Sequence, residues 1–415
     1  MRVAVISLHA SPLLQPGEGD SGGMGVFIRS VWRCLASHGV AADVFTRWNH
    51  PGSPTIVSLA PGVRLIPLPA GPKRPIEKED LLALVPEFTD RLLESTRTDG
   101  RRGSAPYSLV HGHYWLSGLA GARAAAEWDV PLVASFHTLA RVKNAALAPE
   151  DRAEPVVRVR GEDEVVEAAD RVVVPSVEER ANLVGLYRAD PERVAIVPPG
   201  IDSRIFRRRP GPRLRRAHGR MFLFVGRLLR SKGVDVAVRA FEEATRRSPD
   251  GLADARLFVV GGDSANASSA RAWLTANSSI GSRVVLLPAQ PHERLVRLYQ
   301  RATAVLMPSR SESFGLVALE AQACGTPVIA AAVGGLRSVV RNGRTGFLIE
   351  GHDPSAYADR MLWLASNSDA CRRLSLAAMA HARGFSWQTT AIRLLGVYRD
   401  VIAEVRARPA GAVRQ

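Results

Sequence analysis

The sequence predicts an α/β protein built from two doubly wound domains, and three observations lead to this fold class. The chain has 415 residues, whereas a single hydrophobic core stops growing at roughly 250–300 residues. Short apolar, β-branched runs alternate with amphipathic stretches in both halves, as expected for parallel sheets that helices cover on both faces. A segment rich in Pro, Gly and Arg, Val197–Arg220, separates the halves and lacks a sustained apolar period.

The expected strands are buried runs of β-branched and other apolar residues. Ligands bind open α/β sheets beyond the carboxyl ends of their strands, so the loops after these runs are where binding residues are expected. The runs are Val3–Leu8, Leu109–His111, Leu132–Phe136 and Val172–Val174 in the first half, and Phe222–Val225, Leu257–Val260, Val284–Leu287, Ala304–Met307 and Val328–Ala330 in the second.

The boundary between the domains is placed near Gly200, inside the linker. This predicts an N-terminal domain of residues 1–199, a C-terminal domain of residues 200–384 and a terminal segment of residues 385–415. Within that segment, Trp387–Glu404 carries apolar residues at helical spacing, which predicts a helix that packs back on the N-terminal domain. The spaced residues are Ile392, Leu395, Tyr398 and Ile402.

The net charge of +15 raises the hypothesis of a nucleic-acid or membrane partner, because a basic surface attracts polyanions without a specific site. The arginines are spread along the whole chain, and no concentrated basic face or aromatic platform is evident, so we expect no nucleic-acid partner. No apolar run reaches the roughly 18–20 residues of a membrane-spanning helix. The N-terminus does not resemble a signal peptide. We therefore expect a cytoplasmic protein without stable membrane insertion.

Cysteines and lysines are scarce in this sequence. The three cysteines lie far apart without metal-ligand spacing, and no HExxH pattern is present, so no metal site is expected. Because arginine replaces lysine nearly everywhere else, each lysine is a candidate for a position that needs a compact ammonium charge. The cysteines are Cys34, Cys324 and Cys371, and the lysines are Lys73, Lys78, Lys143 and Lys232.

A glycine-rich loop, GEGDSGGMG (residues 17–25), follows the first expected strand and leads into a helix with Phe27, Val31 and Leu35 on one face. Glycines let backbone N–H groups approach a phosphate closely, and a helix start adds partial positive charge. The spacing matches neither a Walker loop nor the GxGxxG fingerprint, so a simple tight turn remains the alternative.

Two further turns in the second half carry charged side chains. Arg227 and Lys232 lie between a strand and the helix that begins near Val234. They could grip a diphosphate, the arginine as a fork and the lysine as a point charge, or they could be solvated surface cations. Glu312 follows another strand, and Glu320 lies on the next helix. Their carboxylates suit hydroxyl groups of a sugar and a ribose, and an unpaired charge inside an apolar helix would be costly.

Polar residues also follow two strands of the first half, in HGHYWLSG and SFHTLARVKN. A single histidine is more often structural than catalytic, but several polar groups at adjacent strand ends favour a binding site. These residues are His111, His113, Tyr114, His137 and Thr138.

Together these motifs resemble the retaining GT-B glycosyltransferases of family four, and among them the mycothiol D-inositol 3-phosphate glycosyltransferases. The likeness spans nearly the whole chain. It is carried by QPGEGDSGGMG, KEDL at Lys78–Leu81, HGHYWLSG, HTLARVKNAALA, FVGR with SKG, and SESFGLVALEAQACGTPV followed by AAAVGGL. The resemblance implies a GT-B fold, with two Rossmann-like domains facing across a cleft, and UDP-N-acetylglucosamine held mainly by the second domain.

The resemblance also implies roles for individual residues. Arg227 and Lys232 would grip the donor diphosphate, and His137 matches the family's active-site histidine, so these three are the expected catalytic residues. The expected donor-binding residues are Gly23, Arg227, Lys232, Glu312, Gly315 and Glu320. The expected acceptor-binding residues are His9, Asp20 and Gly25 near the cyclitol, and Lys78, Tyr114, Thr138 and Arg158 around its phosphate.

The implied reaction moves N-acetylglucosamine to 1D-myo-inositol 3-phosphate by front-face displacement with retention, while Arg227 and Lys232 stabilise the leaving diphosphate. No metal cofactor is required, although Mg²⁺ is compatible. The implied partners are small-molecule substrates and a second copy of the chain in a homodimer. Gly25 stands where the family usually has Asn, and GGDSANASS replaces its usual VGGPSG stretch. The alternative is therefore a secondary-metabolism glycosyltransferase that uses another nucleotide sugar and an aminocyclitol or other small acceptor.

Overall fold

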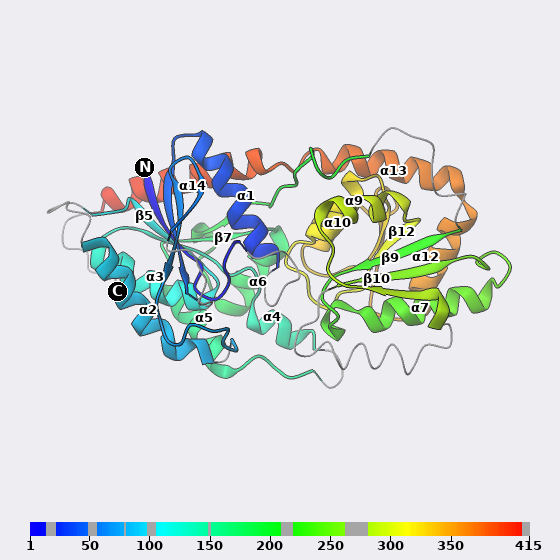
Figure 1. Cartoon of the computed structure of the whole chain (residues 1–415), viewed down its shortest axis with the longest axis horizontal. Helices are drawn as coiled ribbons and strands as arrows, with labels where there is room; N and C mark the ends of the chain where they lie inside the picture. The colour runs from blue at the N-terminus through cyan, green and yellow to red at the C-terminus, as the bar shows by residue number, and fades with distance from the viewer. Residues whose placement is uncertain are drawn as a thin grey trace.

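The computed structural model describes residues 1–13, 22–48, 56–78, 80–97, 105–147, 151–208, 219–261 and 281–408. These residues form two lobes, each built around its own sheet (Figure 1). The predicted α/β class with two Rossmann-like domains is confirmed.

The sheet of the N-terminal lobe has eight strands in the order β3-β4-β2-β1-β5-β6-β7-β8. All neighbouring pairs are parallel except β3 and β4, which are antiparallel. The strands are β1 (Arg2–Ile6), β2 (Ala41–Arg47), β3 (Val57–Ala60), β4 (Val63–Leu68), β5 (Leu109–His113), β6 (Leu132–Ser135), β7 (Arg171–Val174) and β8 (Val194–Ile196).

The sequence missed β2, β3, β4 and β8 and placed the end of β1 two residues too late. Strand β2 carries the buried Asp43, which accepts hydrogen bonds from Arg2, Arg64 and Tyr107 and therefore interrupts the apolar run. Strand β1 ends at Ile6 because the chain turns there, with Ser7 Oγ donating to the carbonyl oxygen of Ala10 at 2.6 Å. Polar residues within a strand thus concealed it from an analysis of apolar runs.

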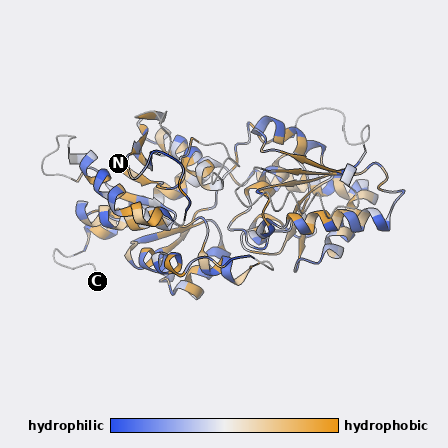
Figure 2. Ribbon diagram, turned by 60° about the horizontal axis from the view of Figure 1, so that its bottom comes forward, coloured by the Kyte–Doolittle hydropathy of each residue, from blue (hydrophilic) through white to orange (hydrophobic). Residues whose placement is uncertain are grey.

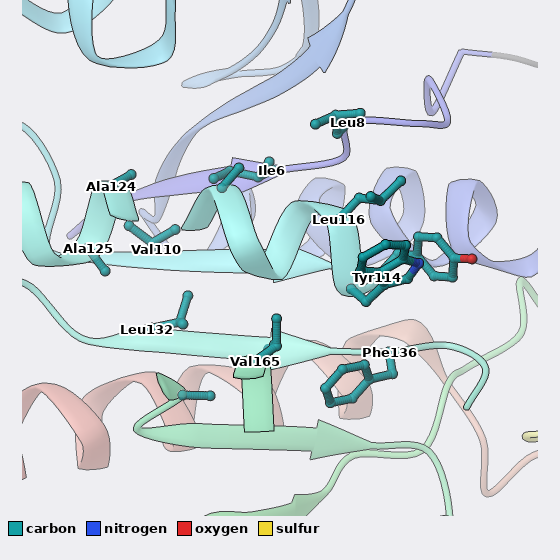
Figure 3. Close-up of a cluster of buried hydrophobic side chains, with 14 of the residues drawn as sticks. Ile6, Leu8, Val110, Tyr114, Leu116, Ala124, Ala125, Leu132, Phe136 and Val165 are labelled. Atoms are coloured by element: carbon teal, nitrogen blue, oxygen red, sulfur yellow. The ribbon is translucent and has the colours of Figure 1, made fainter. Parts of the chain in front are cut away.

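Helices cover both faces of this sheet. On one face α1 and α14 share a core with β1 and β2, and on the other α2, α3, α5 and α6 pack over the remaining apolar side chains. Figure 3 shows part of the second core, with Tyr114 just beyond the end of β5. The helices are α1 (Gly23–Ser37), α2 (Val85–Arg97), α3 (Trp115–Trp128), α4 (Ala140–Ala145), α5 (Val156–Ala168), α6 (Val177–Tyr187) and α14 (Trp387–Arg406), with 3-10 turns η1 (Asp80–Leu84) and η2 (Pro191–Arg193).

The sheet of the C-terminal lobe has six parallel strands in the order β11-β10-β9-β12-β13-β14. Helices α7, α12 and α13 cover one face, and α9, α10 and α11 cover the other. The strands are β9 (Met221–Val225), β10 (Arg256–Val260), β11 (Val284–Leu287), β12 (Ala304–Met307), β13 (Val328–Ala331) and β14 (Gly346–Ile349). The helices are α7 (Val234–Arg247), α9 (His292–Arg301), α10 (Leu316–Ala323), α11 (Leu336–Val339), α12 (Pro354–Ser366) and α13 (Ser368–Ala382), with 3-10 turns η3 (Arg230–Lys232) and η4 (Gly281–Arg283).

Apolar residues dominate the strands of both lobes, whereas the helices carry apolar and polar residues together (Figure 2). This is the pattern of helices that bury one stripe against a sheet. None of the described helices combines the length and the apolar character needed to cross a membrane.

The chain crosses between the lobes twice. In the first tether, residues 197–206, Val197 packs in the N-terminal core and Ile201 in the C-terminal core. In the second tether, residues 383–387, the chain returns and enters α14. The tethers lie side by side, because Ile201 and Ser386 form a parallel bridge and Ile201 N donates to the carbonyl oxygen of Phe385 at 3.2 Å.

Helix α14 lies along the N-terminal lobe (Figure 1) and buries a stripe there that includes the predicted Leu395 and Tyr398, with Ile402 partly buried, but not Ile392. Ile392, predicted on the packing face, is 53% exposed. One residue is about 100° around an α-helix, so the position next to the buried Ala391 turns toward solvent. The buried residues are Trp387, Thr390, Ala391, Leu394, Leu395, Tyr398 and Val401.

We expect Gly200→Ala to destabilise the protein. A Cβ at position 200 would lie 2.2 Å from Trp387 N and 2.3 Å from the carbonyl carbon of Ser386, so the two tethers would have to separate. The expected loss is about 1–3 kcal/mol of unfolding free energy or more, measured by chemical denaturation. The control Gly185→Ala lies in α6 with no atom within 4 Å of its Cβ and should gain about 0.5–1 kcal/mol. Wild-type stability in Gly200→Ala would contradict the close crossing.

Candidate active site

Loops from the carboxyl ends of both sheets meet between the lobes. The N-terminal lobe contributes residues after β1, β5 and β6, and the C-terminal lobe contributes residues after β9 and β12. Several contacts join the sides. Among them, a Cβ at Gly23 would lie 3.2 Å from Leu316 Cδ1, and Ser176 Oγ lies 3.5 Å from the carbonyl oxygen of Ser313. The predicted site residues of the two halves therefore face one region.

Four predicted residues gather on the N-terminal side, and we call Lys78, Tyr114, Thr138 and Arg158 the acceptor-side cluster. The Arg158 guanidinium lies 5.0 Å from the centroid of the Tyr114 ring, and Lys78 Nζ lies 5.9 Å from the same centroid. Arg158 Nη2 donates to Thr138 Oγ1 at 3.0 Å and to the Thr138 carbonyl oxygen at 3.1 Å. Two cations and two hydroxyls in this arrangement suit an anion such as a phosphate.

Two carboxylates hold Arg158 in place, one just before helix α5 and one on it. Arg158 Nη1 donates to Glu154 Oε2 at 2.7 Å, and Nε donates to Glu162 Oε1 at 2.8 Å. Arg158 and Glu162 are four residues apart within α5 and therefore lie on one face of the helix. Arg158 is only 4% exposed, and a buried guanidinium with paired donors is a rigid group.

Lys143 is next to the acceptor-side cluster, although the sequence analysis gave it no role there. It lies on α4, directly after His137 and Thr138, and forms an ion pair with Glu154. Burial lowers the pKa of Lys143 to about 8, and positive charges from both lobes add to this effect. The sequence feature that could have identified Lys143 is the scarcity of lysine, since the chain has only four. The cations that lower the pKa are Arg158, Lys78, Arg227 and Lys232.

His9 borders the acceptor-side cluster. Its ring lies 4.3 Å from that of Tyr114, centroid to centroid, and its buried Nδ1 has no hydrogen-bond partner among the described residues. Burial lowers the pKa of His9 well below its ordinary value, and the positive charge of Lys78 adds to the effect. His9 is therefore neutral near pH 7, with a polar atom available to a ligand.

Three histidines form a group beside the site, in which His111 and His113 are buried and His137 is partly buried. His113 Nδ1 and His137 Nε2 are hydrogen-bonded at 2.9 Å, and the rings of His111 and His113 lie 4.1 Å apart. His111 also bonds to the Tyr398 hydroxyl of α14 at 2.6 Å. Burial lowers the pKa of His137 to about 4 and that of His111 to about 3. The histidines are therefore neutral, and His137 can offer a hydrogen bond but not a positive charge.

On the C-terminal side, Lys232 and Glu312 form an ion pair, with Lys232 Nζ 2.7 Å from Glu312 Oε2. Gly233 explains how the two loops come so close, because it has a φ of 74° and a Cβ there would lie 2.0 Å from the carbonyl oxygen of Pro308. Arg227 is half-buried after β9, and its charge reaches Lys143. The predicted pair, Arg227 and Lys232, thus belongs to one region.

The predicted donor residues Gly315 and Glu320 belong to α10. Gly315 precedes the helix with a φ of 105°, where a Cβ would lie 2.7 Å from Leu336 Cδ2, so the loop requires glycine there. Tyr299 Oη donates to Glu320 Oε2 at 2.8 Å. Burial raises the pKa of the Glu320 carboxyl to about 7, although the hydrogen bond from Tyr299 opposes the rise. Glu320 can therefore accept or donate a hydrogen bond near neutral pH.

The other predicted residues of the glycine-rich loop have different outcomes. Gly23 begins α1, and Gly25 is buried in the first turn of that helix. Asp20 lies outside the described residues. Across the described ranges, no three His, Cys, Asp or Glu side chains gather in a group that could hold a metal ion.

Two Rossmann-like lobes with cations and carboxylates at their adjoining strand ends are the arrangement of a GT-B glycosyltransferase. Residues 22–200 match the model of the glycosyl transferase 4-like domain, and residues 211–381 match glycosyl transferases group 1. D-inositol 3-phosphate glycosyltransferase of Acidothermus cellulolyticus is 46% identical, covering 98% of this chain and 91% of the relative. The enzyme of the same name from Nocardia farcinica is also 46% identical, and the match covers 99% of this chain and 92% of that relative. The chain therefore belongs to this family of glycosyltransferases.

Solved structures show the same architecture. Sucrose-phosphate synthase from Thermosynechococcus elongatus superposes with a TM-score of 0.86 at 29% identity, covering 97% of this chain and 99% of that one. Anabaena HepE in complex with UDP and glucose gives a TM-score of 0.73 at 18% identity, covering 96% and 100%. The expected GT-B fold is confirmed.

We expect Glu320→Gln to change the pH dependence of stability. With a folded pKa of about 7, the native state binds more protons than the unfolded state between the ordinary carboxyl pKa and pH 7, so stability falls as pH rises through this range. The glutamine lacks this titration and still accepts the Tyr299 hydrogen bond, so its melting temperature should fall less from pH 5 to pH 8. The control is Glu164→Gln on the exposed face of α5. Identical pH profiles for Glu320→Gln and wild type would contradict the buried carboxyl.

Proposed function

We propose that the protein transfers N-acetylglucosamine from UDP-N-acetylglucosamine to 1D-myo-inositol 3-phosphate or a closely related cyclitol, with retention of configuration. The observation that carries the proposal is a pair of cationic groups, one on each lobe: the buried Arg158 donates to Thr138 Oγ1 at 3.0 Å beside Lys78, and Lys232 pairs with Glu312 at 2.7 Å. Positive charge that converges from two sides suits two anionic groups, a diphosphate and a phosphate. The curated relatives named D-inositol 3-phosphate glycosyltransferase, at 43–46% identity, support the choice of acceptor.

The donor is assigned to the C-terminal lobe. Arg227 and Lys232 bind the diphosphate oxygens, and Lys232 remains next to Glu312, whose carboxylate accepts hydrogen bonds from sugar hydroxyls. The 2.7 Å ion pair between Lys232 and Glu312 supports this, because it places the phosphate-binding and sugar-binding groups beside each other. Glu320 binds the ribose.

The acceptor is assigned to the N-terminal lobe, with its phosphate on the acceptor-side cluster. The buried Arg158 is fixed by Glu154 and Glu162, so it loses little side-chain entropy when it binds. His9 lies beside Tyr114 and offers its Nδ1 to a hydroxyl of the ring. A phosphorylated cyclitol would thus meet charge at one end and neutral polar atoms at the other.

In the proposed reaction, the bond between the anomeric carbon and the β-phosphate oxygen breaks, and the acceptor hydroxyl forms its new bond on the same face. Arg227 and Lys232 stabilise the charge that accumulates on the leaving diphosphate. The hydroxyl proton passes to an oxygen of that diphosphate, and neutral His137 contributes a hydrogen bond to the reacting sugar. Because side chains supply the positive charge, the proposal requires no metal ion.

A second candidate is a secondary-metabolism glycosyltransferase that uses another nucleotide sugar and an aminocyclitol or other small acceptor. Gly25 favours it, because this position at the buried start of α1 has no side chain where the resembled family usually has an asparagine amide. Turnover of an aminocyclitol, together with no turnover of the inositol phosphate, would select this candidate.

We expect the wild-type protein to release UDP when it is given UDP-N-acetylglucosamine and 1D-myo-inositol 3-phosphate together. Lys232→Met should lower kcat/KM by about 10²–10³, the usual effect of removing one group that stabilises developing charge, while the melting temperature stays close to that of wild type. A coupled UDP-release assay measures both enzymes. Full activity in a folded Lys232→Met variant would contradict the role of Lys232 in binding the donor diphosphate.

We expect Lys78→Met to raise the KM for the phosphorylated acceptor about 10–100-fold, because a hydrogen bond to a charged group contributes about 1.5–3 kcal/mol. The KM for the nucleotide sugar should not change. Lys73→Met is the matched control, since Lys73 Nζ lies 3.9 Å from the centroid of the Trp48 ring, outside the acceptor-side cluster. Equal effects of the two substitutions would contradict a phosphate site at Lys78.

A further inference from the structure

The first turn of α6 contacts the C-terminal lobe through three residues, Ser176, Glu178 and Glu179, which we call the α6 latch. Ser176 Oγ caps the helix by accepting from Glu179 N at 3.2 Å and donates to the carbonyl oxygen of Ser313 over 3.5 Å. Glu178 Oε2 accepts from Ser338 Oγ at 2.7 Å. The Glu179 carboxyl also lies close enough to the Ser313 side chain to interact with it. One turn of helix thus holds two segments of the other lobe.

The two contacted segments are themselves joined. Gly335 N donates to the carbonyl oxygen of Glu312 at 2.9 Å. A Cβ at Gly334 would lie 2.1 Å from that oxygen, and one at Gly335 would lie 2.3 Å from the carbonyl oxygen of Ser313. Residues 312–313 therefore lie directly on the turn that leads into α11, which carries Ser338. The α6 latch therefore contacts both segments of one connected unit, at Ser313 and at Ser338.

Glu179 is unusual within the α6 latch. Its side chain is almost fully buried, at 4% exposed, and Oε1 has no hydrogen-bond partner among the described residues. An ionised carboxylate in such a place would lack the partners that buried charges require. The carboxylates of Glu162 and Glu312 are also close enough to repel a second negative charge.

We propose that the α6 latch positions the donor-sugar loop, residues 312–315, and that Glu179 is a positioning residue that acts as a neutral hydrogen-bonding group. The latch acts through Ser313 on Glu312, which pairs with Lys232. Glu179 itself touches no reacting atom. The inference rests on the proposed function, because it treats Glu312 as the group that binds the donor sugar.

The charge state of Glu179 follows from its surroundings. The pKa of the carboxyl is raised to about 8, mainly by burial and also by the neighbouring carboxylates of Glu162 and Glu312, while the interaction with Ser313 opposes the rise. The carboxyl is therefore mainly protonated at pH 7. Glutamine has the same shape and no charge, so it can replace the acid, whereas alanine removes the contact.

The test compares Glu179→Gln with Glu179→Ala in steady-state kinetics at pH 7. We expect Glu179→Gln to keep the donor KM within about threefold of wild type, and Glu179→Ala to raise it about tenfold with the acceptor KM unchanged. Ser313→Ala should match Glu179→Ala, and the double variant should be no worse than either single variant, because both remove one contact. Glu164→Ala on the exposed face of α5 is the control.

Hydrogen exchange separates this inference from the proposed function, because it needs no substrate. Amides of residues 312–316 should exchange faster in folded Glu179→Ala than in wild type or Glu179→Gln. Failure of wild type to use any nucleotide sugar would overturn the proposed function alone. Unchanged exchange and donor KM in Glu179→Ala, or equal defects in Glu179→Gln and Glu179→Ala, would overturn the role of Glu179.

Discussion

The site depends on holding like charges close together before a substrate arrives. Burial is the main cause that lowers the pKa of Lys143, and the positive charges of Arg158, Lys78, Arg227 and Lys232, which come from both lobes, act in the same direction. Three carboxylates make this arrangement stable: Glu154 pairs with Lys143 and Arg158, Glu162 with Arg158, and Glu312 with Lys232. Arg158 is buried, and burying it without such partners would be costly. The carboxylates therefore keep the cations ordered, and phosphate groups can bind without a large rearrangement of side chains.

Lysine and arginine supply the positive charge of the site, because the three histidines are uncharged. Burial keeps His111, His113 and His137 neutral, and the hydrogen bond between His113 and His137 orients the ring that borders the site. Tyr398 connects this group to α14. Helix α14 thus contacts the histidine group through His111.

The sequence predicted what depends on local pattern and missed what depends on distant contacts. Strands buried on both faces are continuous apolar runs, so β9, β10 and β12 were predicted, whereas β2 was concealed by the buried Asp43 and its ion pairs. The resemblance to family-four glycosyltransferases, more than any local pattern, assigned the main cations and carboxylates of the two halves to one site. The α6 latch was not predicted, because Ser176 and Ser313 are 137 positions apart and meet only when both lobes are in place.

The paired tethers limit how the lobes can move. A single flexible connection would allow one lobe to bend, twist and slide relative to the other. Here the two tethers run side by side and are bridged at Ile201 and Ser386. Gly200 packs directly against the backbone of residues 386–387. Twisting one lobe against the other would break this bridge, and sliding would stretch one of the tethers. Bending at the two tethers is therefore the motion of the lobes that costs the least energy. The lobes are thereby restricted to a hinge motion about the two tethers, which brings the same two surfaces together each time.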